Sequence, residues 1–234
     1  MVPAIQKQKE IIMNKVLKRI VWPIMAIPLI YLAIVWNKLP DKIATHFNYK
    51  GEADQFSDKK GFILLIGFLA VLGISIYLLL ANVYKIDPKK RAAENKGLLH
   101  NIGFAVAVFM AALSCIIIHT AVAGETKLNI KYLFAPIGLL WALIGNYMHN
   151  IKPNYFAGFR LPWTLENEEN WKLTHRLASK LWFAGGLAIA FISIFASMMA
   201  SLISLFAIGA VMTVIPIIYS YRIYKKQKSA THTN

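Results

Sequence analysis

The feature that most constrains this chain is a long run, Leu181–Tyr221, that contains no charged side chain. Drawn as one helix at 1.5 Å per residue, this run would be about 60 Å long, roughly twice the hydrocarbon core of a bilayer. A single straight helix therefore does not fit the membrane. We expect the chain to turn back near Ser197–Ser201 and to form a hairpin of two membrane-spanning helices.

Four further apolar runs have about the length that a membrane-spanning helix needs. Hydrophobic residues make up 57% of the 234 residues and charged residues only 16%, whereas a soluble domain is about one-quarter charged. We predict an all-α integral membrane helical bundle of about six transmembrane helices, that is, a multi-pass membrane protein. The four further runs are Ile20–Trp36, Gly61–Val83, Ile102–Val122 and Tyr132–Met148.

The net charge of +15 follows topology and does not indicate nucleic-acid binding. If the N-terminus is inside, 19 of the 26 Lys and Arg residues lie in inside segments and 7 in outside segments. This asymmetry fits the positive-inside rule and predicts that both termini are cytoplasmic. The basic flanks are then explained by topology and by contact with anionic lipid.

These runs divide the chain into a small and a larger membrane part. The first connection is expected outside the cell, and the segment of residues 154–180 is expected in the cytoplasm. The expected parts are a basic cytoplasmic N-terminus (1–19), a two-span domain (20–83) with an extracytoplasmic loop (37–60), a four-span domain (98–223) and a basic tail (224–234).

The outer connection, Asn37–Lys60, mixes five lysines with four carboxylates. Asn48–Gly51 reads as a turn in which Gly51 takes a positive φ, and Ile43, Phe47 and Phe56 can fold back toward the membrane face. Two interpretations stay open. The connection is either a short ordered surface loop or a contact surface for something arriving from outside.

The cytoplasmic segment, Asn154–Lys180, concentrates polar and aromatic residues between apolar runs. Gly158 and Pro162 disfavour a continuous helix at its start. A helix is expected to follow, with Thr164 or Asn167 as its N-cap. One face of that helix carries four residues at helical spacing, namely Trp171, His175, Ala178 and Trp182.

Two interpretations of this segment are open from the residues alone. In the structural one, Arg160 pairs with Glu166, Glu168 or Glu169, while Trp163 and Trp171 anchor at the membrane interface. In the functional one, exposed aromatic side chains and an arginine form a cytoplasmic docking surface for a partner.

Catalysis is not expected. All eleven carboxylates lie outside the apolar runs, and the sequence has no HExxH, no CxxC, no nucleophile elbow and no glycine-rich phosphate loop. The lone cysteine, Cys115, falls in the third run, and Gly185-Gly186 is expected to allow close helix packing. We therefore predict no catalytic residue, no metal site and no cofactor. A small multispan permease or exporter is the alternative function, although no intramembrane carboxylate supports it.

Two stretches resemble known families. The run Gly158–Leu165 (GFRLPWTL), followed by Trp171-Lys172-Leu173 and Arg176–Lys180, resembles the SdpI family of bacterial multispanning membrane immunity proteins. The first connection is similar to a small N-terminal membrane domain of uncharacterised function (DUF1648-like) often found in that family. Its matching residues are Leu39-Pro40, His46-Phe47-Asn48, Gly51 and Asp54.

The resemblance implies a function with two contact surfaces. It implies protection of the producing cell against a secreted peptide toxin, and recruitment of a cytoplasmic transcriptional repressor to the membrane. The implied toxin-side residues are Pro40, His46, Phe47, Asn48, Gly51 and Asp54 of the outer connection. The implied partner-side residues are Arg160, Pro162, Trp163, Thr164, Trp171, His175 and Arg176.

Overall fold

The structure is a computed structural model that describes residues 2–48, 50–87, 91–124 and 131–231. It forms two compact units, Met1–Leu80 with His100–Ile130 and Ala81–Leu99 with Lys131–Asn234. Tyr49 of the expected turn lies outside the described residues, as do Lys89, Lys90 and Lys127 of the charge count. The first unit contains the first and third apolar runs and most of the second.

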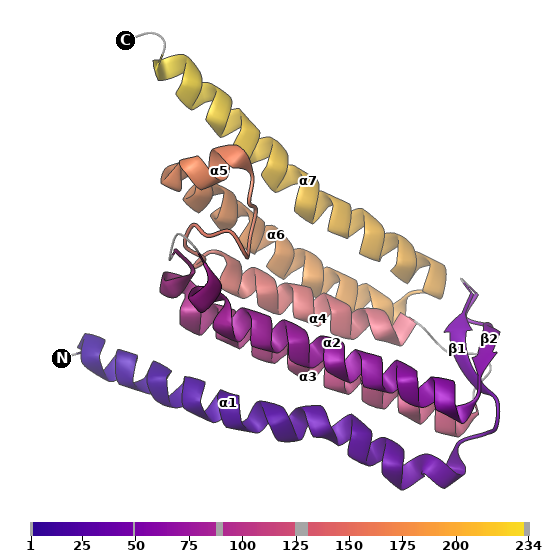
Figure 1. Cartoon of the computed structure of the whole chain (residues 1–234). Helices are drawn as coiled ribbons and strands as arrows, with labels where there is room; N and C mark the ends of the chain where they lie inside the picture. The colour runs from indigo at the N-terminus through magenta and orange to yellow at the C-terminus, as the bar shows by residue number, and fades with distance from the viewer. Residues whose placement is uncertain (1, 49, 88–90, 125–130, 232–234) are drawn as a thin grey trace. The chain divides into compact units, whose positions relative to one another are not determined.

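Seven α-helices dominate the described residues, which confirms the all-α prediction (Figure 1). The sequence did not predict the small two-stranded hairpin that accompanies them. The helices are α1 (Val2–Val35), α2 (Lys59–Ile86), α3 (Lys96–Ala123), α4 (Lys131–Met148), α5 (Pro162–Glu166), α6 (Glu168–Phe195) and α7 (Met198–Thr231). The shorter elements are the 3-10 helices η1 (Trp36–Lys38) and η2 (Arg91–Asn95) and the strands β1 (Ile43–Phe47) and β2 (Ala53–Ser57).

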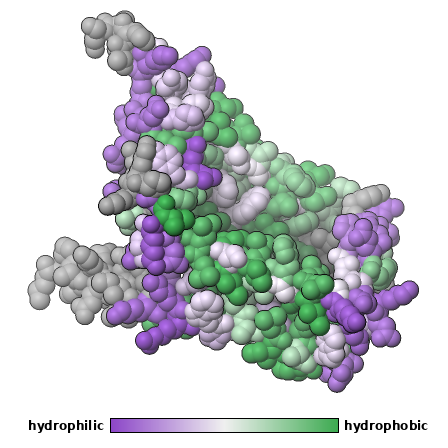
Figure 2. Space-filling view, in the orientation of Figure 1, coloured by the Kyte–Doolittle hydropathy of each residue, from purple (hydrophilic) through white to green (hydrophobic). Residues whose placement is uncertain are grey.

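Among the described residues, five helices are long and apolar enough to cross a membrane, namely α1, α2, α3, α6 and α7. The remaining candidate, α4, has 18 residues and a shorter apolar part, Leu133–Met148, so it would rise about 27 Å against a core of about 30 Å. On the face shown in Figure 2, apolar side chains cover the middle of the helices and polar ones gather toward their ends. Large apolar side chains such as Leu64 (74% exposed) and Phe206 (70%) suit contact with lipid.

The expected helical hairpin is formed by α6 and α7 (Figure 1). The chain turns at Ala196 and Ser197, at the start of the stretch where the turn was expected. The Ser197 carbonyl accepts the Ser201 N–H at 2.9 Å and its hydroxyl accepts the Ala200 N–H at 3.3 Å. Ser197 thus accepts hydrogen bonds from N–H groups in the first turn of α7, including one that has no acceptor within the helix.

Small residues bring α4 and α6 close together. A methyl group on Gly138 would lie 2.6 Å from the Gly186 carbonyl oxygen, and one on Gly186 would meet the backbone of Gly138 and Ala142. Close packing at Gly186 is therefore confirmed. In a bilayer, the hydrophobic effect does not drive helices together, because lipid is as apolar as their side chains. Close backbone packing at small residues stabilises their association instead.

Polar side chains join α6 to α7. Nε1 of Trp182 donates to the Met212 carbonyl at 3.1 Å, and Nδ2 of Asn170 donates to the Ser220 carbonyl at 3.0 Å. Asn170 is fully buried, and its side-chain oxygen accepts from the Thr174 hydroxyl at 3.0 Å. These bonds fix the register between the two helices. The bond from Asn170 also holds the N-terminal end of α6 against α7.

The first unit has its own apolar core at one end of its helices. Val35 of α1, Phe62 and Ile66 of α2 and Ile118 of α3 are buried together with Ile43 of β1. The prediction that Ile43 folds back is thus confirmed, whereas Phe56 is 51% exposed. The hairpin is antiparallel, and its register is irregular around His46.

Candidate functional site

The connection between α4 and α6 is held by an asparagine from a distant part of the chain. Nδ2 of Asn95 donates to the Lys152 carbonyl at 3.0 Å, and its Oδ1 accepts the Lys152 N–H at 2.8 Å. Asn95 is 1% exposed, so this paired bond is shielded from water. Sequence reasoning missed Asn95, because it lies 57 positions away and no local pattern marks it.

A second asparagine shapes the next turn. Oδ1 of Asn154 accepts the N–H groups of Phe156 and Ala157 at 2.8 and 2.9 Å, and its Nδ2 donates to the Lys152 carbonyl at 2.8 Å. The side chain is fully buried. An asparagine that bonds its own following backbone in this way stabilises a turn. Asn154 therefore has a structural role.

The His175 side chain of α6 packs against the stretch around Gly158 and holds it in place. Its Nε2 accepts the Phe159 N–H at 3.0 Å, and its Nδ1 lies 2.8 Å from the Trp171 carbonyl. Gly158 has a φ of 98°, and a methyl group there would clash with the His175 ring. Gly158 and His175 are thus complementary in shape.

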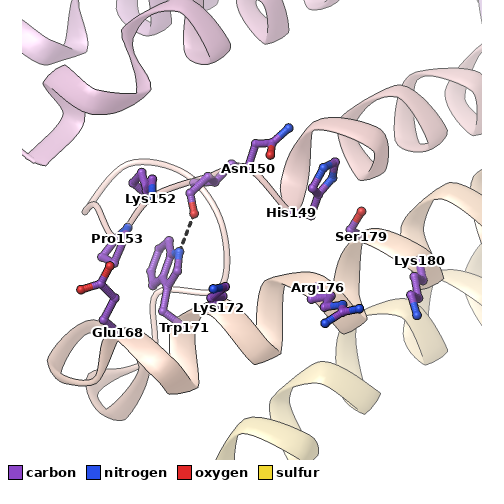
Figure 3. A pocket seen from close by; sticks show the side chains of 11 residues that line it. His149, Asn150, Lys152, Pro153, Glu168, Trp171, Lys172, Arg176, Ser179 and Lys180 are labelled. Carbon is purple, nitrogen blue, oxygen red and sulfur yellow. Dashed lines mark hydrogen bonds between the residues drawn. The ribbon is translucent and has the colours of Figure 1, made fainter. Parts of the chain in front are cut away.

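Trp171 and Thr164 are also turned inward. Nε1 of Trp171 donates to the Ile151 carbonyl at 2.7 Å, and the indole is 1% exposed (Figure 3). The Thr164 hydroxyl donates to the Phe159 carbonyl at 2.6 Å and accepts the Leu161 N–H at 3.0 Å. Both side chains hold the connection in place and are not available to a partner in this conformation.

Asn167, and not Thr164, is the N-cap of α6. Its side-chain oxygen accepts the Asn170 N–H at 2.8 Å, and Glu168 and Glu169 follow in the first turn. Carboxylates in that position interact favourably with the positive end of the helix dipole. The two caps considered from the sequence are thereby distinguished.

Arg160 is exposed, and its guanidinium donates to the Tyr155 carbonyl at 2.9 Å. Within the part of the chain that the structure describes, no carboxylate lies within 4.0 Å of it. The structural interpretation, in which Arg160 pairs with Glu166, Glu168 or Glu169, is therefore wrong on this point. A guanidinium has five N–H donors, and one of them forms this backbone bond on an exposed side chain.

Trp163 fastens α5 to α7. Its Nε1 donates to the Ser220 hydroxyl at 3.0 Å, its ring stacks on Tyr224 with centroids 5.9 Å apart, and it meets Tyr221 edge-on at 5.4 Å. The indole is half-buried. It therefore positions the neighbouring exposed Pro162 and Arg160, although part of its own surface remains accessible.

The seven partner-side candidates thus divide by exposure. Arg160, Pro162 and Arg176 are exposed and Trp163 is half-buried, whereas Thr164, Trp171 and His175 are buried. We call Arg160, Pro162 and Trp163 the α5 surface. The buried residues form its support.

A basic cavity lies beside this support, between the end of α4 and the first half of α6 (Figure 3). Its volume is about 630 Å³. Sequence reasoning missed this cavity because its walls come from two separate segments. The lining residues are His149, Asn150, Ile151, Lys152, Pro153, Glu168, Trp171, Lys172, Arg176, Ser179 and Lys180.

The outer candidates gather on the β1–β2 hairpin. Nδ1 of His46 lies 2.6 Å from Oδ1 of Asp54, and both side chains are largely exposed. Asn48 closes the turn by accepting the N–H groups of Lys50 and Glu52, and Gly51 has a φ of 79°, which confirms the expected positive φ. Pro40 and Phe47 line a small cavity of about 90 Å³ under the hairpin.

No cluster of three or more His, Cys, Asp or Glu side chains that could hold a metal ion occurs among the described residues. The polar groups of the α4–α6 connection are engaged in holding the backbone. The exposed α5 surface therefore rests on buried residues whose polar groups are hydrogen-bonded.

Comparison with known proteins matches both parts of the chain. Residues 150–220 match the model of the SdpI/YfhL protein family, and residues 24–71 match a domain of unknown function, DUF1648. The chain is 26% identical over 195 residues to "Immunity protein SdpI" of Bacillus subtilis (strain 168), an alignment that covers 82% of this chain and 88% of that protein. No solved structure matches.

The family match begins at Asn150 and ends at Ser220, so it contains the Trp171–His175 support, the α5 surface and the α6–α7 hairpin. The apolar helices and these matches lead to one conclusion. The chain is a multi-pass cell-membrane protein whose residues 150–220 match the SdpI/YfhL family and whose residues 24–71 match DUF1648.

Proposed function

We propose that this protein is a membrane immunity protein that protects the producing cell against a secreted peptide toxin. The observation that carries the proposal is the similarity to "Immunity protein SdpI", because it extends over 82% of this chain. An exposed outer hairpin fits the proposal, since a toxin arriving from outside would meet His46 and Asp54 first. Charged side chains on such a surface can contribute specificity for a peptide of complementary charge.

We further propose that the α5 surface binds a cytoplasmic protein, in the manner of a repressor that is drawn to the membrane. Arg160 is held by a single backbone bond and Pro162 is exposed beside it. Arginine and aromatic side chains are enriched at the centres of protein interfaces. The support beneath them makes the surface preorganised, which lowers the entropy lost on binding.

Protection is tested by expressing the full chain in cells that are sensitive to a peptide toxin against which an SdpI-family protein protects. We expect growth at toxin concentrations that stop cells carrying an empty vector. Growth no better than the empty vector, with the protein present in the membrane fraction, would count against immunity.

The α5 surface is tested by Arg160→Ala, with Arg19→Ala as a matched control at another exposed arginine. Recruitment of a fluorescent repressor to the membrane should fall with Arg160→Ala, by roughly ten-fold or more if Arg160 is a central contact. Protection should be retained by both variants. If Arg160→Ala keeps both recruitment and protection, the role given to Arg160 is wrong.

A further inference from the structure

The cavity between α4 and α6 carries an excess of positive charge. Four cationic side chains line it, from Lys152, Lys172, Arg176 and Lys180, against the single carboxylate of Glu168. All four cationic residues are exposed, and within the described residues none lies within 4.0 Å of a carboxylate. The cavity volume of about 630 Å³ is in the range of small-molecule sites, about 300–1,000 Å³.

Three of the cations form one stripe on α6. Lys172, Arg176 and Lys180 are spaced four residues apart, so successive side chains lie one above another on the same face. Like charges at this spacing repel one another and destabilise a helix. An anion bound between the stripe and Lys152 would attract these cations and offset their mutual repulsion.

The position along the helices indicates where the anion comes from. Lys180 directly precedes the uncharged run that begins at Leu181, and Arg176 lies about 6 Å further along the axis. The apolar part of α4 ends at Met148, next to His149 of the cavity. Since the polar layer on each side of a bilayer is about 5–8 Å thick, the cavity lies at headgroup depth.

We propose that this cavity binds the phosphate group of an anionic phospholipid from the cytoplasmic leaflet. Arg176 and Lys180 contact the phosphate oxygens, Lys172 and Lys152 close the outer side, and Ser179 supplies a hydroxyl donor. Basic pockets between transmembrane helices on the cytoplasmic side are suited to such headgroups. The site is separate from the α5 surface and does not depend on the proposed immunity function.

The test uses the purified full chain in a non-ionic detergent, with phosphatidylglycerol as the probe and native mass spectrometry to measure the bound fraction. Lys172→Gln/Arg176→Gln/Lys180→Gln should weaken binding by on the order of 100-fold, about five-fold for each cation removed. The matched control, Lys225→Gln/Lys226→Gln/Lys228→Gln, removes the same charge from exposed positions of α7 outside the cavity and should change binding less than about three-fold. The charge-keeping variant Lys172→Arg/Arg176→Lys/Lys180→Arg should bind within about ten-fold of the original chain, which separates loss of charge from loss of folding.

Two competitors identify the ligand. Phosphatidylcholine should not displace phosphatidylglycerol, and millimolar inorganic phosphate should not displace it either. Displacement by inorganic phosphate would overturn the lipid assignment in favour of a soluble phosphate compound. Equal loss of binding in the cavity and α7 variants, or no loss in the cavity variant, would overturn the site itself.

Discussion

The backbone N–H of Phe159 donates a hydrogen bond to Nε2 of His175, 3.0 Å away and 16 positions further along the chain. On the other side of the ring, Nδ1 faces the Trp171 carbonyl at 2.8 Å. A carbonyl can only accept, so Nδ1 carries the hydrogen and Nε2 does not. His175 is therefore the neutral tautomer with both nitrogens engaged, fully buried between a helix and the loop that it supports.

Replacing His175 by leucine should destabilise the protein. The Phe159 N–H would lose its acceptor, and an unsatisfied buried donor costs about 1–3 kcal/mol. The thermal unfolding midpoint of the purified protein in detergent measures the effect. His46→Leu is the control, since that ring is exposed and its loss should change stability by less than about 0.5 kcal/mol. Equal shifts for the two variants would contradict the supporting role of His175.

Replacing Gly158 by alanine should be more damaging than its size suggests. The backbone φ of 98° is unfavourable for any side chain, and the added methyl group would also clash with the His175 ring. Gly124→Ala isolates the first effect, because Gly124 has a φ of 64° but open space around it. We expect about 1 kcal/mol for Gly124→Ala and at least about 2 kcal/mol more for Gly158→Ala, measured by thermal unfolding. Similar values would show that the ring moves aside.

Replacing Asn95 by alanine should loosen the α4–α6 connection locally. The Lys152 N–H loses its side-chain acceptor, so amide hydrogen exchange across residues 149–160 should accelerate by on the order of ten-fold, equivalent to about 1.4 kcal/mol. Exchange is followed by mass spectrometry of peptides from that stretch. Asn150→Ala changes an exposed asparagine in the same connection and should leave exchange unaltered. An effect of Asn150→Ala as large as that of Asn95→Ala would remove the special role of Asn95.

Adding one methyl group at Gly186 should separate α4 from α6. The new Cβ would meet the backbone of Gly138 and Ala142, and overpacking of this kind costs about 1–3 kcal/mol. Gly67→Ala in α2 is the matched control, because no atom lies within 4 Å of the added group and alanine favours a helix by up to about 1 kcal/mol. The two variants should shift the unfolding midpoint in opposite directions. A stabilising Gly186→Ala would contradict the packing described for this interface.

The sequence predicted what depends on length and periodicity. The α6–α7 turn follows because an uncharged run of that length cannot lie straight across a bilayer, and the face of Trp171, His175, Ala178 and Trp182 follows from helical spacing. Whether these side chains face the solvent or the protein interior was harder to predict. Trp171 and His175 carry polar atoms that suggest an exposed surface, yet both rings find backbone partners in the preceding loop.

Contacts between distant segments were beyond local patterns. Asn95 is hydrogen-bonded to Lys152, 57 positions away, and no residue near either position predicts this contact. The strands β1 and β2 lack the alternation of apolar and polar residues that marks a half-buried strand, so the outer connection read as a loop. The basic cavity requires α4 and α6 to lie side by side, an arrangement that depends on contacts between distant segments such as those of Gly138 and Gly186.

Ile43 gives the outer hairpin a property that an ordinary loop lacks. Its side chain is 1% exposed and shares one apolar core with Val35 of α1, Phe62 of α2 and Ile118 of α3. A displacement of the Ile43 side chain would therefore disturb the packing of three helix ends at once, because packed cores deform little. A molecule that binds the hairpin must either leave these helix ends in place or displace them together.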